Sequence, residues 1–249
     1  MLRRRTARST MILATVLLAT GCADHVPGTA MPAPSVAPAT TPAAAREFEW
    51  LKQVLPNGAE LSRAVGYAVD LDGSTPSIGG GSDLRNTKPV VSKVSEADCL
   101  GVVSALEESS YSAAPVRAVT YATEPEATYG AVLLSSPDAA ARVFTSMSEQ
   151  WQRCNGRTVV DASGNHLLKD RIEAVTATDD LLSAKVLLTS DSPTGIPVQI
   201  VRALGVSEDC IVEAELFVAG DPATTTTLTT EGAVKLVESM MANVRTATR

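Results

Sequence analysis

Histidine is nearly absent from this 249-residue chain, which contains two, and aromatic residues make up only 4% of it. His25 stands in a segment rich in proline and alanine, and His166 follows Gly164-Asn165, a pair typical of turns. Neither histidine is placed to serve a catalytic triad, and no second histidine can help His166 to hold a metal. No G-x-S-x-G nucleophile motif is present either. The sequence therefore predicts no catalytic residue, no cofactor and no metal site.

Basic residues are also scarce, and four of the chain's 21 stand at its very start, at Arg3, Arg4, Arg5 and Arg8. Without that segment, 17 Lys and Arg face 28 Asp and Glu, which gives a formal charge of −11. Binding to nucleic acid depends on Lys and Arg contacts with phosphate. An acidic domain of this kind is therefore expected to have no nucleic-acid partner.

Long apolar runs are missing as well. The run that begins at Met11 is shorter than the roughly 20 residues needed to span a bilayer. Arginines precede it, and it ends in Leu18-Ala19-Thr20-Gly21-Cys22, so it has the parts of a secretory signal. A cysteine directly after small residues resembles the bacterial lipobox, in which that cysteine is lipidated and becomes the mature N-terminus. We therefore predict a signal peptide over residues 1–21 and lipidation at Cys22, with a simple cleaved signal as the alternative.

The segment after Cys22 is dense in Ala, Pro, Thr and Ser and has almost no charge up to residue 45. Such a composition cannot bury a core and stays extended or disordered. We interpret residues 22–45 as a flexible tether and residues 46–249 as one folded domain. The expected location is the outer face of the cell membrane, where the acyl chains at Cys22 would provide the contact with the bilayer.

Three cysteines remain in the expected domain, at Cys99, Cys154 and Cys210. Cysteines outside the membrane usually pair, but three cannot all pair, so one is left over. Cys210 shares strand parity with Val212, Ala214, Leu216 and Val218, which points its side chain into the core. It is therefore expected to be a buried, inert thiol.

Hydrophobic periodicity divides the domain into helices followed by strands. Asn57 with Glu60 forms a predicted capping box at a helix start, and Ser136-Pro137 predicts the start of the clearest helix, which runs to Cys154. Ser95 is a predicted N-cap for a helix that carries Cys99, Val102, Val103 and Leu106 on its buried face. Predicted strands cover 117–123, 128–134 and several segments after Gly156, and a last helix begins near Thr230. This order favours an α+β fold with an antiparallel sheet.

The order and spacing of particular residues resemble a known family. Cys99 on a helix is followed by Tyr111, two strands, the run Trp151-Gln152-Arg153-Cys154-Asn155-Gly156, and later Arg202-Ala203-Leu204 in a strand. From Leu51 to the last helix, this is similar to the PknH-like extracellular sensor domain of mycobacterial Ser/Thr kinases and lipoproteins. The resemblance implies a single α+β domain, an antiparallel twisted sheet flanked by helices, and a cleft for an unidentified ligand. No kinase domain accompanies it here.

The same resemblance implies that Cys99 and Cys154 form a disulfide. A second disulfide of the family is absent, because Ile200 stands at one of its positions and Phe217 or Val218 near the other. An apolar pair is expected to replace that bridge.

Arg202 is in phase with Val198, Ile200, Leu204 and Val206, which places a charge on a predicted buried face. It is expected either to form a structural ion pair with Glu213 or Glu215, or to bind an anionic ligand at the base of a cleft.

Three functions stay open from the sequence. The first is a lipid-anchored, non-catalytic domain that binds an unidentified small molecule in a cleft. The second is a module that binds envelope proteins through an exposed apolar patch. The third is an envelope hydrolase that uses carboxylates such as Glu124 and Glu126.

Overall fold

The computed structural model describes residues 46–69, 71, 76–86, 93–163, 166–219 and 229–247. By its internal contacts the chain divides after Ala37, and every described residue belongs to the second part. The predicted signal peptide, the lipidation residue Cys22, the tether and His25 all lie outside the described residues.

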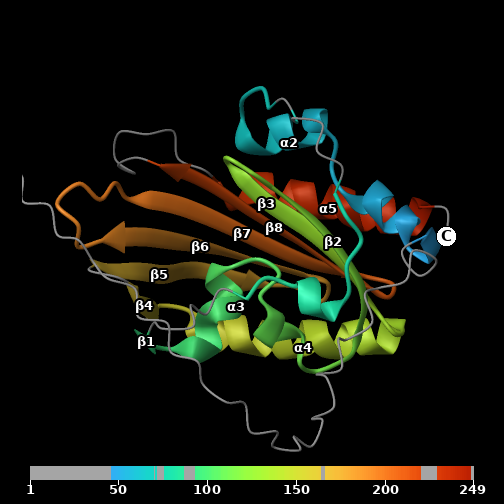
Figure 1. Ribbon diagram of the computed structural model, residues 1–249, viewed down its shortest axis with the longest axis horizontal. Helices are drawn as coiled ribbons and strands as arrows, with labels where there is room; N and C mark the ends of the chain where they lie inside the picture. The colour runs from blue at the N-terminus through green and yellow to red at the C-terminus, as the bar shows by residue number, and fades with distance from the viewer. Residues whose placement is uncertain are drawn as a thin grey trace, which may run out of the picture. The chain divides into compact units, whose positions relative to one another are not determined.

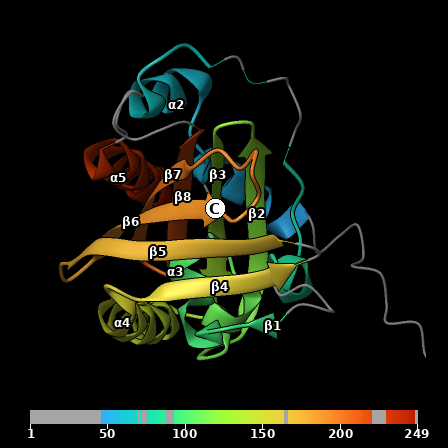
Figure 2. The same cartoon turned by 90° about the vertical axis from the view of Figure 1, so that its left-hand side faces the viewer.

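A sheet of eight strands forms the centre of the described part of the chain (Figure 1). The strand order is β1-β4-β5-β6-β7-β8-β3-β2, and every neighbouring pair is antiparallel. The strands are β1 (Lys93–Val94), β2 (Val116–Glu124), β3 (Ala127–Leu134), β4 (Thr158–Ser163), β5 (His166–Ala177), β6 (Leu181–Ser190), β7 (Val198–Ser207) and β8 (Cys210–Ala219). Seen from the side, β4 and β5 cross the direction of β2 and β3, so the sheet is strongly twisted (Figure 2). The predicted antiparallel α+β fold is confirmed.

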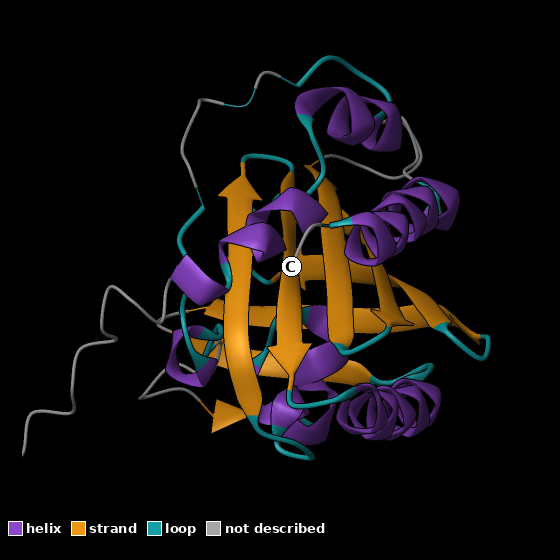
Figure 3. Cartoon of the chain, turned by 90° about the vertical axis from the view of Figure 1, so that its right-hand side faces the viewer, coloured by secondary structure: helices purple, strands orange, loops and turns teal. Residues whose placement is uncertain are grey.

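Helices pack on both faces of this sheet (Figure 3). One face is covered by the 3₁₀ helix η1 (Glu49–Val54), α2 (Gly58–Val65) and α5 (Thr230–Thr246). The other face is covered by η3 (Ala97–Cys99), α3 (Leu100–Val103), η4 (Glu108–Tyr111) and α4 (Pro137–Cys154). The short η2 (Gly81–Asp83) contacts β2 at the edge of the sheet. Each face has its own hydrophobic core. We call the first of these faces the α5 face and the second the α4 face.

Strand β8 shows how alternation divides its residues between the two faces. Cys210, Val212, Ala214 and Leu216 belong to the core of the α5 face, as their shared parity predicts. The residues between them face α4, and two of these are the buried glutamates Glu213 and Glu215. Ile200 of β7 lies directly opposite Phe217 of β8, so an apolar pair does stand in neighbouring strands at that point.

The predicted starts of two helices are confirmed. At α2, the Asn57 side chain accepts a hydrogen bond from the Glu60 backbone amide at 3.1 Å, and the Glu60 carboxylate accepts one from the Asn57 amide at 2.9 Å. At α4, the Ser136 hydroxyl accepts from the Ala139 amide at 3.1 Å, with Pro137 in the first turn. The apolar face of α4 is buried along its length.

The helix predicted from Ser95 to Leu106 is wrong in its start and its length. The Ser95 hydroxyl accepts a hydrogen bond from Val160 of β4 at 3.0 Å, so it does not cap a helix. Helix α3 ends at Val103, and Leu106 has a φ of 60° in the left-handed region. The apolar side chains of this segment are nevertheless buried. Burial in an irregular loop therefore produced the spacing that the sequence suggested was helical.

The two edges of the sheet differ in length. Edge strand β1 has only two residues. At the other edge, β2 carries an irregularity between Val116 and Ala118, and Gly79 bridges to Val119 with backbone hydrogen bonds of 2.8 and 2.9 Å. No helix in the described ranges is long and apolar enough to cross a membrane.

Cys99 and Cys154 form a disulfide with an S–S distance of 2.07 Å and a Cα–Cα distance of 5.7 Å, as the resemblance implied. The bond joins the ends of η3 and α4, which are 55 residues apart in the chain. In the chain-entropy account a loop of this length is worth about 4 kcal/mol. Cys210 is fully buried and is in no disulfide with the described cysteines, which confirms its predicted placement in the core.

Candidate functional site

Arg202 lies in the middle of β7 on the α4 face, and its side chain is completely buried. One terminal nitrogen donates to the Glu213 carboxylate at 2.6 Å, and the other donates to the Val102 carbonyl at 2.9 Å. The guanidinium carbon also lies 5.3 Å from the centre of the Trp151 ring. The predicted ion pair with a carboxylate of β8 is therefore present, and its partner is Glu213.

Glu213 is held on its other oxygen by the α4-face loops. That oxygen accepts hydrogen bonds from the Leu106 amide at 3.1 Å and from the Tyr111 hydroxyl. Burial raises the pKa of Glu213, while the Arg202 charge and the bonds from Tyr111 and Leu106 oppose that rise. Burial, followed by the nearby Glu213 charge, holds the pKa of Tyr111 well above its ordinary value. Tyr111 is therefore a neutral donor over the physiological pH range.

A second ion pair lies beside the first. Glu215 is directly opposite Arg202 in the register of β7 and β8, but its carboxylate accepts from the Ala105 amide at 2.7 Å and from Arg85 at 3.3 Å. Arg85 also donates to the Ala105 carbonyl at 3.2 Å. We call Arg85, Tyr111, Arg202, Glu213 and Glu215 the ionic cluster.

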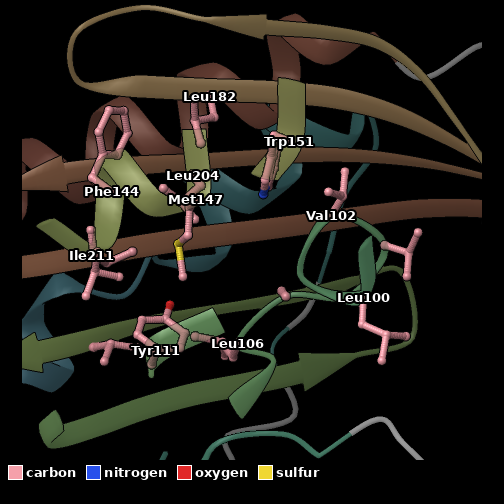
Figure 4. Close-up of a cluster of buried hydrophobic side chains, with 14 of the residues drawn as sticks. Leu100, Val102, Leu106, Tyr111, Phe144, Met147, Trp151, Leu182, Leu204 and Ile211 are labelled. Atoms are coloured by element: carbon pink, nitrogen blue, oxygen red, sulfur yellow. The ribbon is translucent and has the colours of Figure 1, made fainter. Parts of the chain in front are cut away.

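The ionic cluster fixes the loop between α3 and η4 onto the sheet. Its members bind the carbonyl of Val102, both backbone polar groups of Ala105 and the amide of Leu106. Consecutive amides can point at neighbouring carboxylates here because the chain turns through the left-handed conformation of Leu106. In Figure 4, Tyr111 and Leu106 lie together at the bottom of this core, Val102 lies at the right near Trp151, and Met147 of α4 lies above Tyr111.

Tyr111 links the ionic cluster to a cavity of about 460 Å³. Its lining includes Leu84, Glu107, Glu108, Tyr111 and Val116, from η4, β2 and the segment after η2. We call it the Tyr111 cavity. Leu84 also lines a neighbouring cavity of about 400 Å³ that extends along β2 to Tyr121.

Two further cavities lie elsewhere. One of about 220 Å³ shares Ser109 and Ser112 with the Tyr111 cavity and lies on the far side of η4, toward α4. The other, of about 270 Å³, lies between α2 and α5 on the α5 face, where the Ser239 hydroxyl donates to Glu60.

The other residues considered from the sequence are dispersed. His166 is about half exposed at the start of β5, with its Nδ1 3.4 Å from Asp191. Glu124 and Glu126 lie at the tight connection between β2 and β3. Within the described ranges, no three His, Cys, Asp or Glu side chains are grouped so that they could hold a metal ion.

Asp170 is a feature that sequence reasoning missed. It lies on β5, opposite Val159 and Leu188, on the face that contains Ile172 of the α4-face core. Burial first, and then the charges of Glu215 and Asp161, raise its pKa from 3.8 to about 7. An acid in phase with Ile172 in an otherwise mixed strand is the signal that could have identified it.

Replacement of Arg202 tests the ion pair. We expect Arg202→Ala to lower the free energy of unfolding by about 3–5 kcal/mol, because it leaves the buried Glu213 charge uncompensated. Urea titration followed by tryptophan fluorescence measures the change. Lys235→Ala is the matched control, since its pair with Glu231 has the same 2.6 Å separation but is exposed, and we expect no measurable loss there. A well-folded Arg202→Ala protein of unchanged stability would contradict the structural role.

The raised pKa of Asp170 predicts a pH dependence of stability. Between about pH 4 and 7 the folded protein keeps a proton on Asp170 that the unfolded chain has lost. The contribution of Asp170 to the free energy of unfolding is therefore fully present below pH 4. It is lost as the pH rises to 7, by at most roughly 1.4 kcal/mol per pH unit. Unfolding free energies of wild type and Asp170→Asn at pH 4, 5.5 and 7 measure it, with the exposed Glu149→Gln as control. Parallel pH profiles for wild type and Asp170→Asn would refute this assignment.

Known proteins show which family has this architecture. No curated protein sequence gives a significant match. The chain is similar in structure to the extracellular domain of PknH from Mycobacterium tuberculosis, with a TM-score of 0.62, 18% identity, and coverage of 80% of this chain and 96% of that one. The sequence family described as PknH-like extracellular domain matches residues 49–243. This match covers almost the whole described part of the chain, and the chain therefore belongs to the PknH-like extracellular domain family.

Proposed function

We propose that this protein is a lipid-anchored, extracytoplasmic and non-catalytic binding domain whose small-molecule ligand occupies the Tyr111 cavity. The family of extracellular domains supports the location. The basic and apolar segment that ends at Cys22 supports export and attachment to the membrane through lipid. Attachment by lipid would hold the domain at the outer face of the cell membrane.

The observation that carries the proposal is the connection between the Tyr111 cavity and the ionic cluster. Tyr111 is only 3% exposed, and its hydroxyl is bound to Glu213. A binding site works best when its walls are held by packing and by hydrogen bonds behind them. Here the wall at Tyr111 is fixed from behind by the Arg202–Glu213 ion pair. The cavity's size is within the roughly 300–1,000 Å³ typical of small-molecule sites.

In this proposal Arg202 is a positioning residue. Its guanidinium holds Glu213, and Glu213 in turn holds Tyr111 at the cavity. Its direct contact with an anionic ligand stays a prediction, and its complete burial favours the indirect role.

The two alternatives have weaker support. A protein-binding module would use a broad apolar patch, but only three large apolar side chains of the described residues, Tyr67, Leu167 and Ile196, are exposed. A carboxylate-dependent hydrolase is favoured by the pKa of Asp170, near 7. Asp170 lines none of the four cavities described above.

The ligand hypothesis is tested with protein purified from its own cell envelope. We expect native mass spectrometry to show an additional bound mass on the wild-type protein, and we expect Glu108→Trp to remove it. Glu108 is exposed and lines the Tyr111 cavity, so an indole there would fill its mouth without disturbing the core. Glu149→Trp, on the exposed side of α4, should keep the mass. A mass that persists in Glu108→Trp, or no bound mass in the wild type, would exclude the Tyr111 cavity.

Attachment to the membrane is tested at Cys22. Cells grown with a palmitate analogue should incorporate it into the wild-type protein, which should sediment with membranes. Cys22→Ala should lose both the label and the sedimentation, whereas Cys210→Ala should keep both because Cys210 is buried in the core. Labelling that survives in Cys22→Ala would show that the lipid is attached elsewhere.

A further inference from the structure

The charges around the Tyr111 cavity are of one sign. Glu107 and Glu108 stand next to each other in its wall, and no Lys, Arg or His is among the described residues that line it. The described lining of the neighbouring cavity along β2 likewise contains Asp83 and no basic side chain. A ligand in the Tyr111 cavity therefore meets carboxylates as its charged neighbours.

The two arginines that come next to lining residues in the chain are already paired with other glutamates. The Arg85 guanidinium binds the Glu215 carboxylate at 3.3 Å, as part of the ionic cluster. The Arg117 guanidinium binds the Glu47 carboxylate at 3.1 Å. Neither arginine lines the Tyr111 cavity, so their charges are spent on partners outside it.

Glu108 is the carboxylate that a ligand can contact. It is exposed, and its backbone amide donates to the Arg85 carbonyl at 2.8 Å, which fixes the start of η4. Its Oε2 accepts a hydrogen bond from the Asn86 side-chain amide at 3.1 Å. Its Oε1 has no hydrogen-bond partner among the described residues. A donor group of a ligand can therefore bind Oε1 without displacing a contact that the described chain makes.

Glu107 contributes in a different way. Its side chain is only 1% exposed, and its Oε1 accepts from the Ser109 hydroxyl at 3.2 Å. It is therefore part of the wall and not a contact group for a ligand. Its charge still acts on the cavity, because charges interact more strongly across protein than across water.

The apolar part of the lining defines the rest of the ligand. Leu84, Ala114 and Val116 face the cavity, and Val116 is the most exposed of the three. An apolar body placed against them removes water from their surface, which is favourable. The volume of about 460 Å³ has room for a body of several carbon atoms beside a charged head group.

We propose that the Tyr111 cavity selects an organic cation, an amine or a guanidine with a short apolar body, whose head group binds Glu108. A hydrogen bond from a charged donor to a carboxylate is stronger than one between neutral groups. An anionic ligand would instead meet like charges, which oppose binding. This inference rests on the proposed function, because it names the class of ligand for that same cavity.

Three probes that share one apolar body test the charge preference: hexylammonium, 1-hexanol and hexanoate. Each is titrated into the purified, oxidised full chain at pH 7, and the NMR signals of the Glu108 amide and the Val116 methyl groups report binding. We expect hexylammonium to bind most tightly, 1-hexanol to bind more weakly and hexanoate to leave the signals unchanged. Added salt should weaken the binding of hexylammonium and have no effect on that of 1-hexanol.

Removal of one charge identifies the contact group. Glu108→Gln keeps the shape of the side chain and an acceptor for Asn86. Its affinity for hexylammonium should fall about fivefold, and its affinity for 1-hexanol should equal that of the wild type, which also shows that the cavity is intact. Glu149→Gln is the matched control, since Glu149 is exposed on α4 and lies outside the cavity lining. It should bind all three probes as the wild type does.

The inference is overturned if hexylammonium does not bind, if the three probes bind equally well, if hexanoate binds most tightly, or if Glu108→Gln keeps full affinity for hexylammonium. The proposed function is decided separately, by the native bound mass and its loss in Glu108→Trp. A native ligand that is lost in Glu108→Trp but is neutral or anionic would refute the cationic class alone. A wild type that carries no native ligand but prefers hexylammonium would contradict the proposed function alone.

Discussion

The burial of the Arg202–Glu213 ion pair is the constraint on which the α4 face depends. Two charges removed from water are tolerated only when each is paired and the remaining polar atoms are hydrogen-bonded. Glu213 meets that condition by accepting from Arg202, Tyr111 and Leu106, and Arg202 meets most of it through Glu213 and the Val102 carbonyl. The pair therefore holds the α3–η4 loop in place, and η4, which follows this loop, lines two of the cavities.

The two faces of the sheet differ in the charged groups that they bury. The described core of the α5 face is formed by apolar side chains, and Gly205 of β7 allows α5 to lie close to the strand, since a β-carbon there would collide with Met241. The α4 face instead combines an apolar core with the ionic cluster, Asp170 and three of the four cavities. The α4 face therefore buries the charged groups of the ionic cluster within an apolar core that is at least as extensive as that of the α5 face.

The sequence predicted the structure correctly where helix capping, apolar spacing and strand alternation determine it. The helix from Pro137 follows from its cap and its apolar spacing, and the burial of Arg202 follows from strand alternation. The helix predicted through Leu106 was wrong, because a loop that the ionic cluster holds on the sheet buries its apolar residues at helix-like intervals. The candidate site was only partly predictable: Glu213 was foreseen as a partner for Arg202, but Tyr111 is 102 residues from Glu213 in the chain. No local pattern can reveal a contact of that range, and the same holds for Arg85 and Glu215.

The edges of the sheet have a consequence for how this domain meets other proteins. An exposed strand edge is a template on which a second chain can add a strand. Edge strand β1 is only two residues long. Strand β2 has an irregularity between Val116 and Ala118, and its Val119 is already hydrogen-bonded to the backbone of Gly79. Growth of the sheet by a partner's strand is therefore disfavoured at both ends. We therefore expect other proteins to contact the helices and loops of this domain. We expect no strand of another chain to extend its sheet.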